Sequence, residues 1–433
     1  MNEPMNPVGV IGAGPGGLLA AAALKKRGVP FVVLDAGRGP GGIWDIDRDE
    51  TPMYESAHFI SSRTLSGFPD FPMPDSYADY PRHDRILEYI QAFARHHDLE
   101  RHITFGVRVE EAERGPQGGW TVRLDQGDEL ALSALVVATG MTWYPRLPDV
   151  PGDFEGEAYH AFHYRSPREF DGKRVLVVGG GNSAADIACD AARSAARAFL
   201  SVRRGYHFIP KFIFGQPADV FAHAGPQLPQ WLEERVFGFL MNRILVGDLT
   251  RLGLPAPDHP ILRSHPVLNT QILHHLGHGD IEAVRDVQSV HGRTVTFVDG
   301  RTEDVDLILW ATGYEWKFPF LSDGVAPWKD GALDLYLHVF DRRYDDLFFM
   351  GIFETDGAAY GLFHQQAELI AAYVDAGGDN SRRTAFDALR QQARPDLKGG
   401  RIYVDSPRHT HYVKGDVYEK ALASAIRDVQ NGR

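Results

Sequence analysis

The sequence predicts an α/β fold with two Rossmann-like domains, and three observations support this prediction. Two glycine-rich turns, Gly-x-Gly-x-x-Gly at 12–17 and Gly-x-Gly-x-x-Ala at 179–184, each follow a short apolar strand and open a helix-forming run. Apolar strands that end in Ala-Thr-Gly recur later in both halves, at 135–140 and 309–313. This repetition indicates a duplicated dinucleotide-binding architecture.

The first turn belongs to a complete strand, turn and helix unit. Gly12 permits a tight turn, Gly14 lets the backbone approach a pyrophosphate, and Gly17 lets the helix pack close to the strand. A second strand at 31–34 leads to Asp35, at the position where an acid accepts hydrogen bonds from an unphosphorylated ribose. These features together predict a dinucleotide site rather than an ordinary glycine turn.

The second turn differs from the first at the residue that matches Asp35. Arg203 lies at almost the same offset from its turn as Asp35 and is the first candidate at this position, with Arg204 beside it; an arginine there suits a 2′-phosphate that an aspartate would repel. The first half is therefore expected to bind FAD and the second NADPH. The alternative for the two arginines is that they are solvated surface charges. The candidate cofactor-binding residues are Gly12, Gly14, Pro15, Gly16, Gly17, Asp35, Gly42, Trp44 and Gly140 for FAD, and Gly179, Gly181, Asn182, Ser183, Arg203 and Arg204 for NADPH.

The other segments complete this scheme. A glycine pair before Trp44 allows a second close backbone approach to the first ligand. The proline-rich stretch at 54–80 is expected to be irregular and to build part of a site. The remaining expected elements are a helix at 83–97, strands at 103–110 and 120–124, a linker at 143–152 and a helix at 363–374.

The last part of the chain is expected to rejoin the first domain, which makes that domain discontinuous. We expect an FAD-binding domain at 1–164 and 305–433, and an NADPH-binding domain at 165–304 with a helical insertion at 210–280. The amphipathic stretch at 232–241 is expected to pack over a substrate cleft. Membrane contact is the alternative, which the acidic chain disfavours.

Composition excludes several classes of function. A formal net charge of −13 argues against a nucleic-acid partner. Neither a signal peptide nor a membrane-spanning run is visible, so we expect a cytoplasmic protein. The single cysteine, Cys189, excludes a disulfide reductase. His274, His275 and His278 have helical spacing but no accompanying zinc-hydrolase motif, so no metal is expected.

Several further motifs resemble those of the class B flavin-dependent monooxygenases, specifically the flavin-containing monooxygenases. The family's linker signature, Phe-x-Gly-x-x-x-His followed by an aromatic residue, is matched at 154–164. Baeyer–Villiger members usually carry Trp-Pro at the end of this linker, where this chain has Tyr164-Arg165. The similarity spans residues 8 to about 375. It also includes Gly-Gly-Ile-Trp at 41–44, Phe-Pro-Asp-Phe-Pro-Met-Pro at 68–74, Gly-Asn-Ser-Ala-Ala-Asp-Ile-Ala at 181–188 and Ala-Thr-Gly-Tyr at 311–314.

The resemblance implies an NADPH- and FAD-dependent monooxygenase. Such an enzyme inserts one oxygen atom from O2 into a soft nitrogen or sulfur nucleophile through a C4a-hydroperoxyflavin, and NADP stays bound. Its partners would be a small-molecule amine or sulfide and O2, and the family implies a homodimer. The alternatives are a Baeyer–Villiger monooxygenase, an uncoupled NADPH oxidase and a redox-sensing protein that binds both cofactors without turnover.

One position departs from the family pattern. The family generally has an asparagine before the proline-rich segment, close to the flavin, and alignment on Phe68 places Ile60 there. Isoleucine has no hydrogen-bond donor in its side chain. Either the hydroxyls of Ser61 and Ser62 replace the amide as catalytic groups, or the enzyme releases hydrogen peroxide; ordinary loop hydroxyls are the alternative for both serines.

Overall fold

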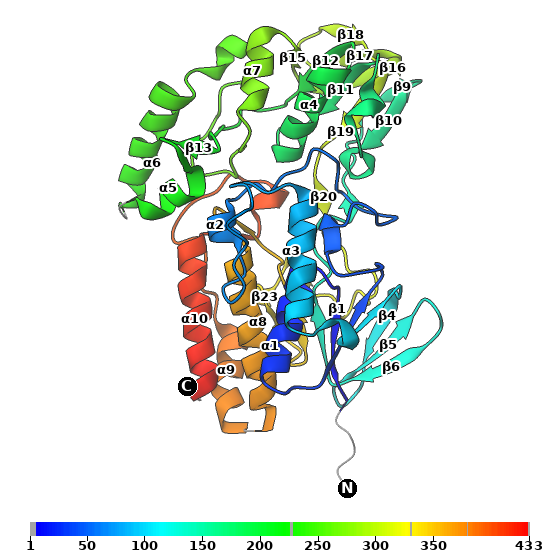
Figure 1. Cartoon of the computed structure of the whole chain (residues 1–433), viewed down its shortest axis with the longest axis vertical. Helices are drawn as coiled ribbons and strands as arrows, with labels where there is room; N and C mark the ends of the chain where they lie inside the picture. The colour runs from blue at the N-terminus through cyan, green and yellow to red at the C-terminus, as the bar shows by residue number, and fades with distance from the viewer. Residues whose placement is uncertain (1–5, 226–227, 330, 379, 432–433) are drawn as a thin grey trace. The chain divides into compact units, whose positions relative to one another are not determined.

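The computed structural model describes residues 6–225, 228–329, 331–378 and 380–431 (Figure 1). The chain divides into two compact units. Unit 1 comprises Met1–Arg48, Arg63–Met141 and Lys317–Arg433, and unit 2 comprises Asp49–Ser62 and Thr142–Trp316. Each unit contains a sheet with parallel strands covered by helices, which confirms the predicted α/β fold class.

Unit 1 is built on a seven-stranded sheet in the order β23-β24-β25-β7-β1-β2-β3. Strand β1 (Val8–Ile11) is fully buried and pairs in parallel with β2 (Phe31–Asp35) and β7 (Ala134–Val137). These strands read as continuous apolar runs because both faces of the sheet are covered. The other strands of the sheet are β3 (Ile103–Phe105), β23 (Leu335–Tyr336), β24 (Phe340–Asp341) and β25 (Leu347–Phe349).

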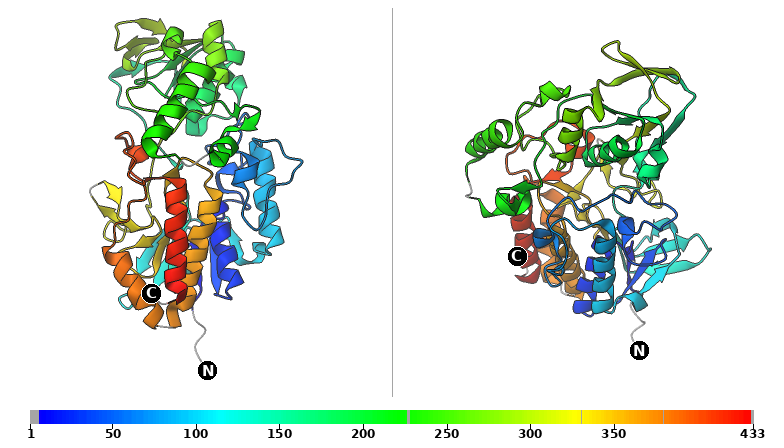
Figure 2. Two further views of the ribbon diagram at one scale, coloured as in Figure 1. Left: turned by 90° about the vertical axis from the view of Figure 1, so that its left-hand side faces the viewer. Right: turned by 45° about the horizontal axis from the view of Figure 1, so that its top comes forward.

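Three helices of unit 1 pack in succession. Helix α1 (Pro15–Lys26) packs on α8 (Tyr360–Asp375), and α8 packs on α10 (Gly415–Asn431), which Figure 2 shows running side by side. The run of alanines in α1 presents a flat surface, which allows the close approach of α8. The unit also contains α2 (Arg63–Ser66), α3 (His83–His96), α9 (Asn380–Gln392), a sheet of β4 (Val109–Arg114), β5 (Trp120–Leu124) and β6 (Glu129–Leu132), and the short strands β21 (Trp328–Lys329), β22 (Ala332–Leu333), β26 (Glu354–Thr355) and β27 (Tyr412–Val413).

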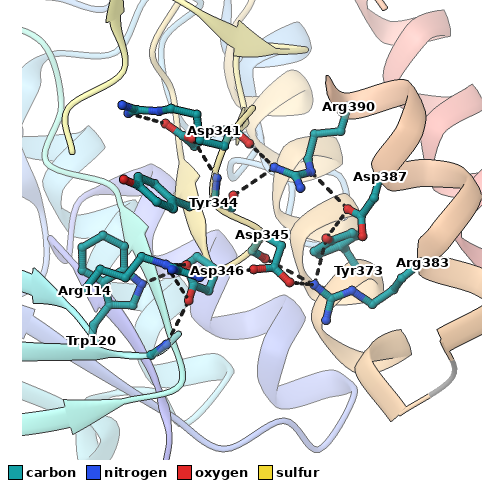
Figure 3. A network of polar contacts seen from close by, with 12 residues as sticks. Arg114, Trp120, Asp341, Tyr344, Asp345, Asp346, Tyr373, Arg383, Asp387 and Arg390 are labelled. Atoms are coloured by element: carbon teal, nitrogen blue, oxygen red, sulfur yellow. Dashed lines mark hydrogen bonds and ion pairs between the residues drawn. The ribbon is translucent and has the colours of Figure 1, made fainter. Parts of the chain in front are cut away.

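A polar network joins the loop at 341–346 to the small sheet and to α9 (Figure 3). The Asp346 carboxylate accepts hydrogen bonds from Arg114 Nε at 2.8 Å and from the Gly119 amide at 2.9 Å. Arg390, whose side chain is buried, donates to the Asp341 and Tyr344 carbonyl oxygens. The loop is therefore held through its backbone and its carboxylates together.

Unit 2 contains a five-stranded parallel sheet in the order β10-β19-β11-β12-β15. Helix α4 (Asn182–Ser194) follows β11 (Arg174–Val178) and packs on β12 (Arg197–Ser201). The other strands of this sheet are β10 (Glu157–His160), β19 (Leu307–Trp310) and β15 (Ile281–Val284). A second sheet consists, in order, of β18 (Thr302–Asp304), β17 (Thr294–Phe297), β16 (Val287–Gly292) and β9 (Gly152–Phe154). The short strands β8 (Tyr144–Pro145) and β20 (Tyr314–Glu315) pair with each other.

Residues 210–280 of unit 2 have a small apolar core of their own, around Ile213, Met241 and Ile261. The amphipathic stretch at 232–241 lies mostly in α6 (Gln230–Phe239), in which no residue is fully buried. The Trp231 and Phe239 side chains of this helix are 65% and 63% exposed. The segment also contains β13 (Phe212–Ile213), β14 (Gln216–Pro217), α5 (Ala218–Ala224), the π-helix η5 (Leu240–Leu245) and α7 (Gln271–His278).

The two units differ in their limits from the domains expected from the sequence. Strands β10 and β19 pair with each other, and β19 pairs with β11, so residues 142–164 and 305–316 pack with unit 2. Residues 49–62 also pack with unit 2. In the part of the chain that the structure describes, no helix is long and apolar enough to cross a membrane.

Candidate functional site

The first glycine turn is shaped by steric demands that only glycine meets. Gly12 has φ +110°, and a Cβ there would lie 2.5 Å from the Ala138 carbonyl oxygen. A Cβ at Gly17 would lie 1.8 Å from the Gly12 oxygen. A Cβ at Gly14 would instead meet Gly42 Cα at 3.5 Å, an ordinary contact distance. Gly12 and Gly17 thus serve the fold. Gly42 allows the two backbone turns to approach closely, because a Cβ there, at φ +60°, would lie 2.9 Å from Gly14 Cα.

Asp35 is held beside the first glycine turn by three hydrogen bonds. Its carboxylate is 6% exposed and accepts hydrogen bonds from the Ala13 amide at 2.6 Å, the Gly37 amide at 2.6 Å and Arg48 Nη1 at 2.9 Å. A carboxylate has about four acceptor positions, so one remains for a hydroxyl. Sequence reasoning missed Arg48, because no local pattern links it to Asp35.

The residues predicted to bind FAD meet at one edge of the seven-stranded sheet. Gly12, Asp35 and Gly140 follow the carboxyl ends of β1, β2 and β7, which are neighbours in the sheet. Ligands of open α/β sheets bind at this edge. Helix α1 begins here with Pro15 and has no side-chain cap, so its first N–H groups suit a diphosphate. The cradle therefore fits a dinucleotide, and Gly16, Gly17, Gly42 and Trp44 lie in the same two turns.

A narrow pocket lies at the second glycine turn of unit 2. Gly179 has φ +147°, and a Cβ there would lie 2.3 Å from the Ala311 carbonyl oxygen, so the close approach requires glycine. The Tyr206 ring rests against Gly180, where an added Cβ would lie 1.9 Å from it. The pocket is lined by residues 179–181, Ala185, Leu200, Val202, residues 204–206, Phe208, Leu254, Pro255, Val267 and Ile272.

The two candidate arginines have different environments. Arg204 lines the pocket, and its guanidinium carbon lies 5.8 Å from the centre of the Tyr206 ring. The buried Arg204 Nε has no hydrogen-bond partner among the described residues. Arg203 is exposed to solvent. An unpaired buried guanidinium N–H suits an oxyanion, so Arg204, rather than the exposed Arg203, is the better placed of the two to bind a phosphate.

Asn182 and Ser183 occupy the first turn of α4. The Asn182 side chain accepts a hydrogen bond from the Leu268 amide at 2.7 Å and donates to the Pro266 carbonyl at 3.4 Å. Its role in the fold is therefore to hold the segment before α7. Gly181 has no side-chain cap for α4, which leaves the first N–H groups of this helix for an anion.

The predicted catalytic serines lie in the segment that packs with unit 2. Ser62 is fully buried, and its amide donates to Asp219 Oδ2 at 2.6 Å. The Ser62 hydroxyl has no hydrogen-bond partner within the described part of the chain. Ser61 and Ile60 are half-buried. Sequence reasoning missed Asp219, on α5, because 157 residues separate it from Ser62.

The linker histidine has a structural role. The His160 Nδ1 accepts a hydrogen bond from the Phe162 amide at 3.1 Å, and the ring lies 5.1 Å from that of Tyr314. Burial lowers the pKa of His160 to about 4, so the imidazole is neutral at physiological pH. A neutral, buried ring bonded to its own backbone holds the linker in place.

Comparison with known proteins gives consistent matches. The family model "FMO-like: Flavin-binding monooxygenase-like" matches residues 5–377. Indole-3-pyruvate monooxygenase YUCCA1 of Oryza sativa subsp. japonica is 35% identical, covering 76% of this chain and 79% of the relative. Dimethylaniline monooxygenase (N-oxide-forming) 2 of Rattus norvegicus is 31% identical, covering 83% and 71%.

Solved structures also resemble this fold. The open crystal structure of cyclohexanone monooxygenase has a TM-score of 0.73 at 19% identity, covering 99% of both chains. The structure of S-allyl-L-cysteine S-oxygenase from Allium sativum has a TM-score of 0.65 at 22% identity, covering 98% of this chain and 89% of that one.

Proposed function

The chain belongs to the flavin-binding monooxygenase-like family, and from that premise we propose that it oxygenates a soft nitrogen or sulfur nucleophile. Members of this family are FAD- and NADPH-dependent monooxygenases, so the enzyme class and both cofactors follow from membership. The substrates are O2 and a small molecule. The proposal concerns the kind of atom that receives the oxygen.

The linker at 154–165 is the observation that carries the proposal. Baeyer–Villiger members of the class usually have Trp-Pro where this chain has Tyr164-Arg165. Tyr164 is fully buried, stacks on Phe170 with ring centres 5.0 Å apart, and donates to Asp190 Oδ2 at 3.0 Å. These contacts fix Tyr164 within unit 2, and the absence of Trp-Pro at this point of the linker supports the nitrogen- or sulfur-oxygenating group. The 31% identical relative is named for N-oxide formation, which agrees with it.

We assign the cofactors to the two glycine turns. The amides at the start of α1 would hold the FAD diphosphate, and Asp35 would accept from a ribose hydroxyl. The amides at the start of α4 and the free Arg204 N–H would hold the NADPH phosphates. Bound FAD supplies the redox chemistry with NADPH and O2. The protein contributes position, exclusion of water and hydrogen bonds.

A carbonyl substrate is the competing proposal, since the 35% identical relative is named for indole-3-pyruvate, a 2-oxo acid. The second competing proposal is an uncoupled NADPH oxidase, which releases hydrogen peroxide. It is suggested by Ile60, which provides no hydrogen-bond donor where the family has asparagine. Ser61 and the unpaired Ser62 hydroxyl are our candidates for replacing that donor.

A single coupled assay tests these proposals. NADPH consumption, O2 uptake, peroxide release and product are measured with a panel of amines, sulfides, ketones and indole-3-pyruvate. We expect an amine or sulfide to give product in proportion to NADPH and to lower peroxide release. Product from carbonyl compounds alone would contradict the proposal and establish the competing one. Peroxide release that no compound lowers would identify an oxidase.

A further inference from the structure

Residues 49–62 are attached to helix α4 by two hydroxyl side chains. The Tyr54 hydroxyl donates to Asp186 Oδ2 at 3.3 Å, and the Ser56 hydroxyl donates to Asp190 Oδ2. The two acids are four residues apart, so they lie on one face of α4. Neither family membership nor the assignment of the cofactors to the two turns requires these contacts.

The same helix begins at the second glycine turn. Ala185 lines the pocket at that turn. Asp186 follows it directly and lies one helical turn after Asn182, where α4 begins. Tyr54 thus contacts α4 just beyond its first turn, and it does so from the segment that carries Ile60.

The far end of the segment is held as well. The Ser62 amide donates to Asp219 on α5, and the Glu55 amide donates to the Arg165 carbonyl at 2.9 Å. Eight residues separate Tyr54 from Ser62, and the segment between them has contacts at both ends. We therefore expect a change in the contacts of Tyr54 to alter the position of residues 60–62, because only a short stretch of chain, held at both ends, lies between them.

The two carboxylates on α4 are costly to bury. Burial raises the pKa of Asp186 and of Asp190, and like charge on the same helix face adds to the cost. Lys211 and Arg193 offset it only in part: Lys211 acts through space, and Arg193 Nη1 lies 3.5 Å from Asp190. The groups that face the two acids are Tyr54, Asn269 and Lys211 for Asp186, and Ser56, Tyr164 and Arg193 for Asp190.

We propose that Tyr54 and Asp186 are positioning residues that couple dinucleotide binding at the second glycine turn to the placement of Ile60, Ser61 and Ser62. The inference rests on the assignment of NADPH to that turn. A dinucleotide bound at the start of α4 restricts the motion of this end of the helix, and Tyr54 passes the restriction to the segment through its bond to Asp186. Coupling of this kind is reciprocal, so loss of the tyrosine bond also weakens dinucleotide binding.

Hydrogen–deuterium exchange of the FAD-loaded protein, with and without NADP+, tests the coupling. In the wild type we expect NADP+ to slow exchange both at 179–188 and at 55–62. Tyr54→Phe is expected to keep the protection at 179–188 and to lose it at 55–62. By reciprocity it should weaken NADP+ binding about fivefold, the lower end of the coupling typical between two sites.

The matched control is Tyr159→Phe, which removes another tyrosine hydroxyl bonded to a carboxylate in unit 2, Glu169 Oε2 at 2.7 Å. It should leave the NADP+ effect at 55–62 unchanged. If Tyr54→Phe loses its flavin or unfolds, Asp186→Asn is used instead, because the amide oxygen can still accept from Tyr54. That variant should keep the protection at 55–62, whereas Asp186→Ala should lose it.

The outcomes separate this inference from the proposed function. Protection at 179–188 without any at 55–62 in the wild type would overturn the coupling and leave the NADPH assignment standing. Undiminished protection at 55–62 in Tyr54→Phe would also overturn it. If NADP+ protects neither stretch in the wild type, the assignment of NADPH to the second turn is wrong, and the coupling fails with it.

Discussion

Within the first turn, Gly14 is the position at which we expect a substitution to disturb cofactor binding but not folding. An added Cβ there meets only ordinary contacts within the protein, but a valine side chain would project where the backbone is expected to approach the FAD diphosphate. We expect Gly14→Val to fold with the urea midpoint of the FAD-free wild type and to contain little FAD, as measured from its absorption spectrum. Gly324→Val is the control, since nothing lies within 4 Å of a Cβ at Gly324. A yellow Gly14→Val protein would show that FAD binds elsewhere.

Arg204 is the side chain that we expect to select NADPH over NADH. It lines the pocket with a free buried N–H, whereas Arg203 points to solvent. A charge-assisted hydrogen bond contributes about 1.5–3 kcal/mol, so Arg204→Ala should raise KM for NADPH about 10- to 100-fold and leave NADH nearly unchanged. Arg203→Ala should have the smaller effect. Equal losses with both nucleotides would indicate damage to the fold.

In our proposal, the side chain at position 60 sets how much peroxide is released per NADPH consumed. Removing one aligned donor from an active site typically costs about 2.7–4 kcal/mol, so supplying one should matter. We expect Ile60→Asn to lower the peroxide released per NADPH consumed severalfold, and Ser62→Ala to raise it. Ile60→Val is the control, because it changes size without adding a donor. An unchanged ratio in both Ile60→Asn and Ser62→Ala would mean that the stabilising donor lies at another position.

Among the elements of unit 1, the loop at 341–346 depends on one buried arginine of α9. Arg390 donates to two carbonyl oxygens of this loop and to Asp387 Oδ1 at 3.1 Å (Figure 3). Arg390→Ala leaves these acceptors unpaired, so the free energy of unfolding should fall by about 3 kcal/mol in urea titrations. Arg394→Ala is the control on the same stretch of chain, since its side chain is 53% exposed. It should change stability by less than about 0.5 kcal/mol.

The hairpin between β23 and β24 turns through two residues in the left-handed region. Leu337 has φ +53° and His338 has φ +52°, a pattern of type I′ turns that favours asparagine and glycine. Burial lowers the pKa of His338 to about 3, helped by the nearby His411 and Lys398. His338→Asn suits the backbone and removes the titrating group, so it should stabilise the protein in acid. It should have less effect above pH 7.

For the whole molecule, buried neutral histidines predict a loss of stability in mild acid. The pKa values of His160 and His411 are lowered to about 4 by burial, against about 6.5 in an unfolded chain. Between pH 6.5 and 4 the unfolded state takes up protons that the folded state does not, so the free energy of unfolding falls as pH falls. Each of these histidines should cost about 2 kcal/mol at pH 5.

Urea titrations at pH 8 and pH 5 measure this difference. His338→Asn should reduce it by a similar amount, about 2 kcal/mol, because His338 belongs to the same group of buried imidazoles. His291→Asn is the control, since that side chain is 93% exposed. A difference between the two pH values that His338→Asn leaves intact would exclude His338 from the groups that cause the acid sensitivity.

The sequence by itself determined the α/β class, the duplication, the two glycine turns and the acid at the end of β2. Each is read from local patterns, and the duplication from the recurrence of one such pattern in both halves. Gly17 shows this directly, because the contact that requires glycine there is with the Gly12 oxygen of the same turn, whereas at Gly12 the contact is with Ala138, which follows the neighbouring strand β7. The family and its two cofactors followed from the same local motifs.

Only the tertiary structure decided which of two adjacent arginines lines the pocket, because consecutive residues after a strand point different ways and packing selects between them. It likewise decided that residues 142–164 and 305–316 pack with unit 2, since the paired residues of β10 and β19 are 150 positions apart in the chain. The contacts of Ser62 with Asp219 and of Tyr54 with Asp186 span 157 and 132 residues. No periodicity or spacing in the sequence predicts such pairs, because the two partners lie far apart in the chain and come together only in the folded structure.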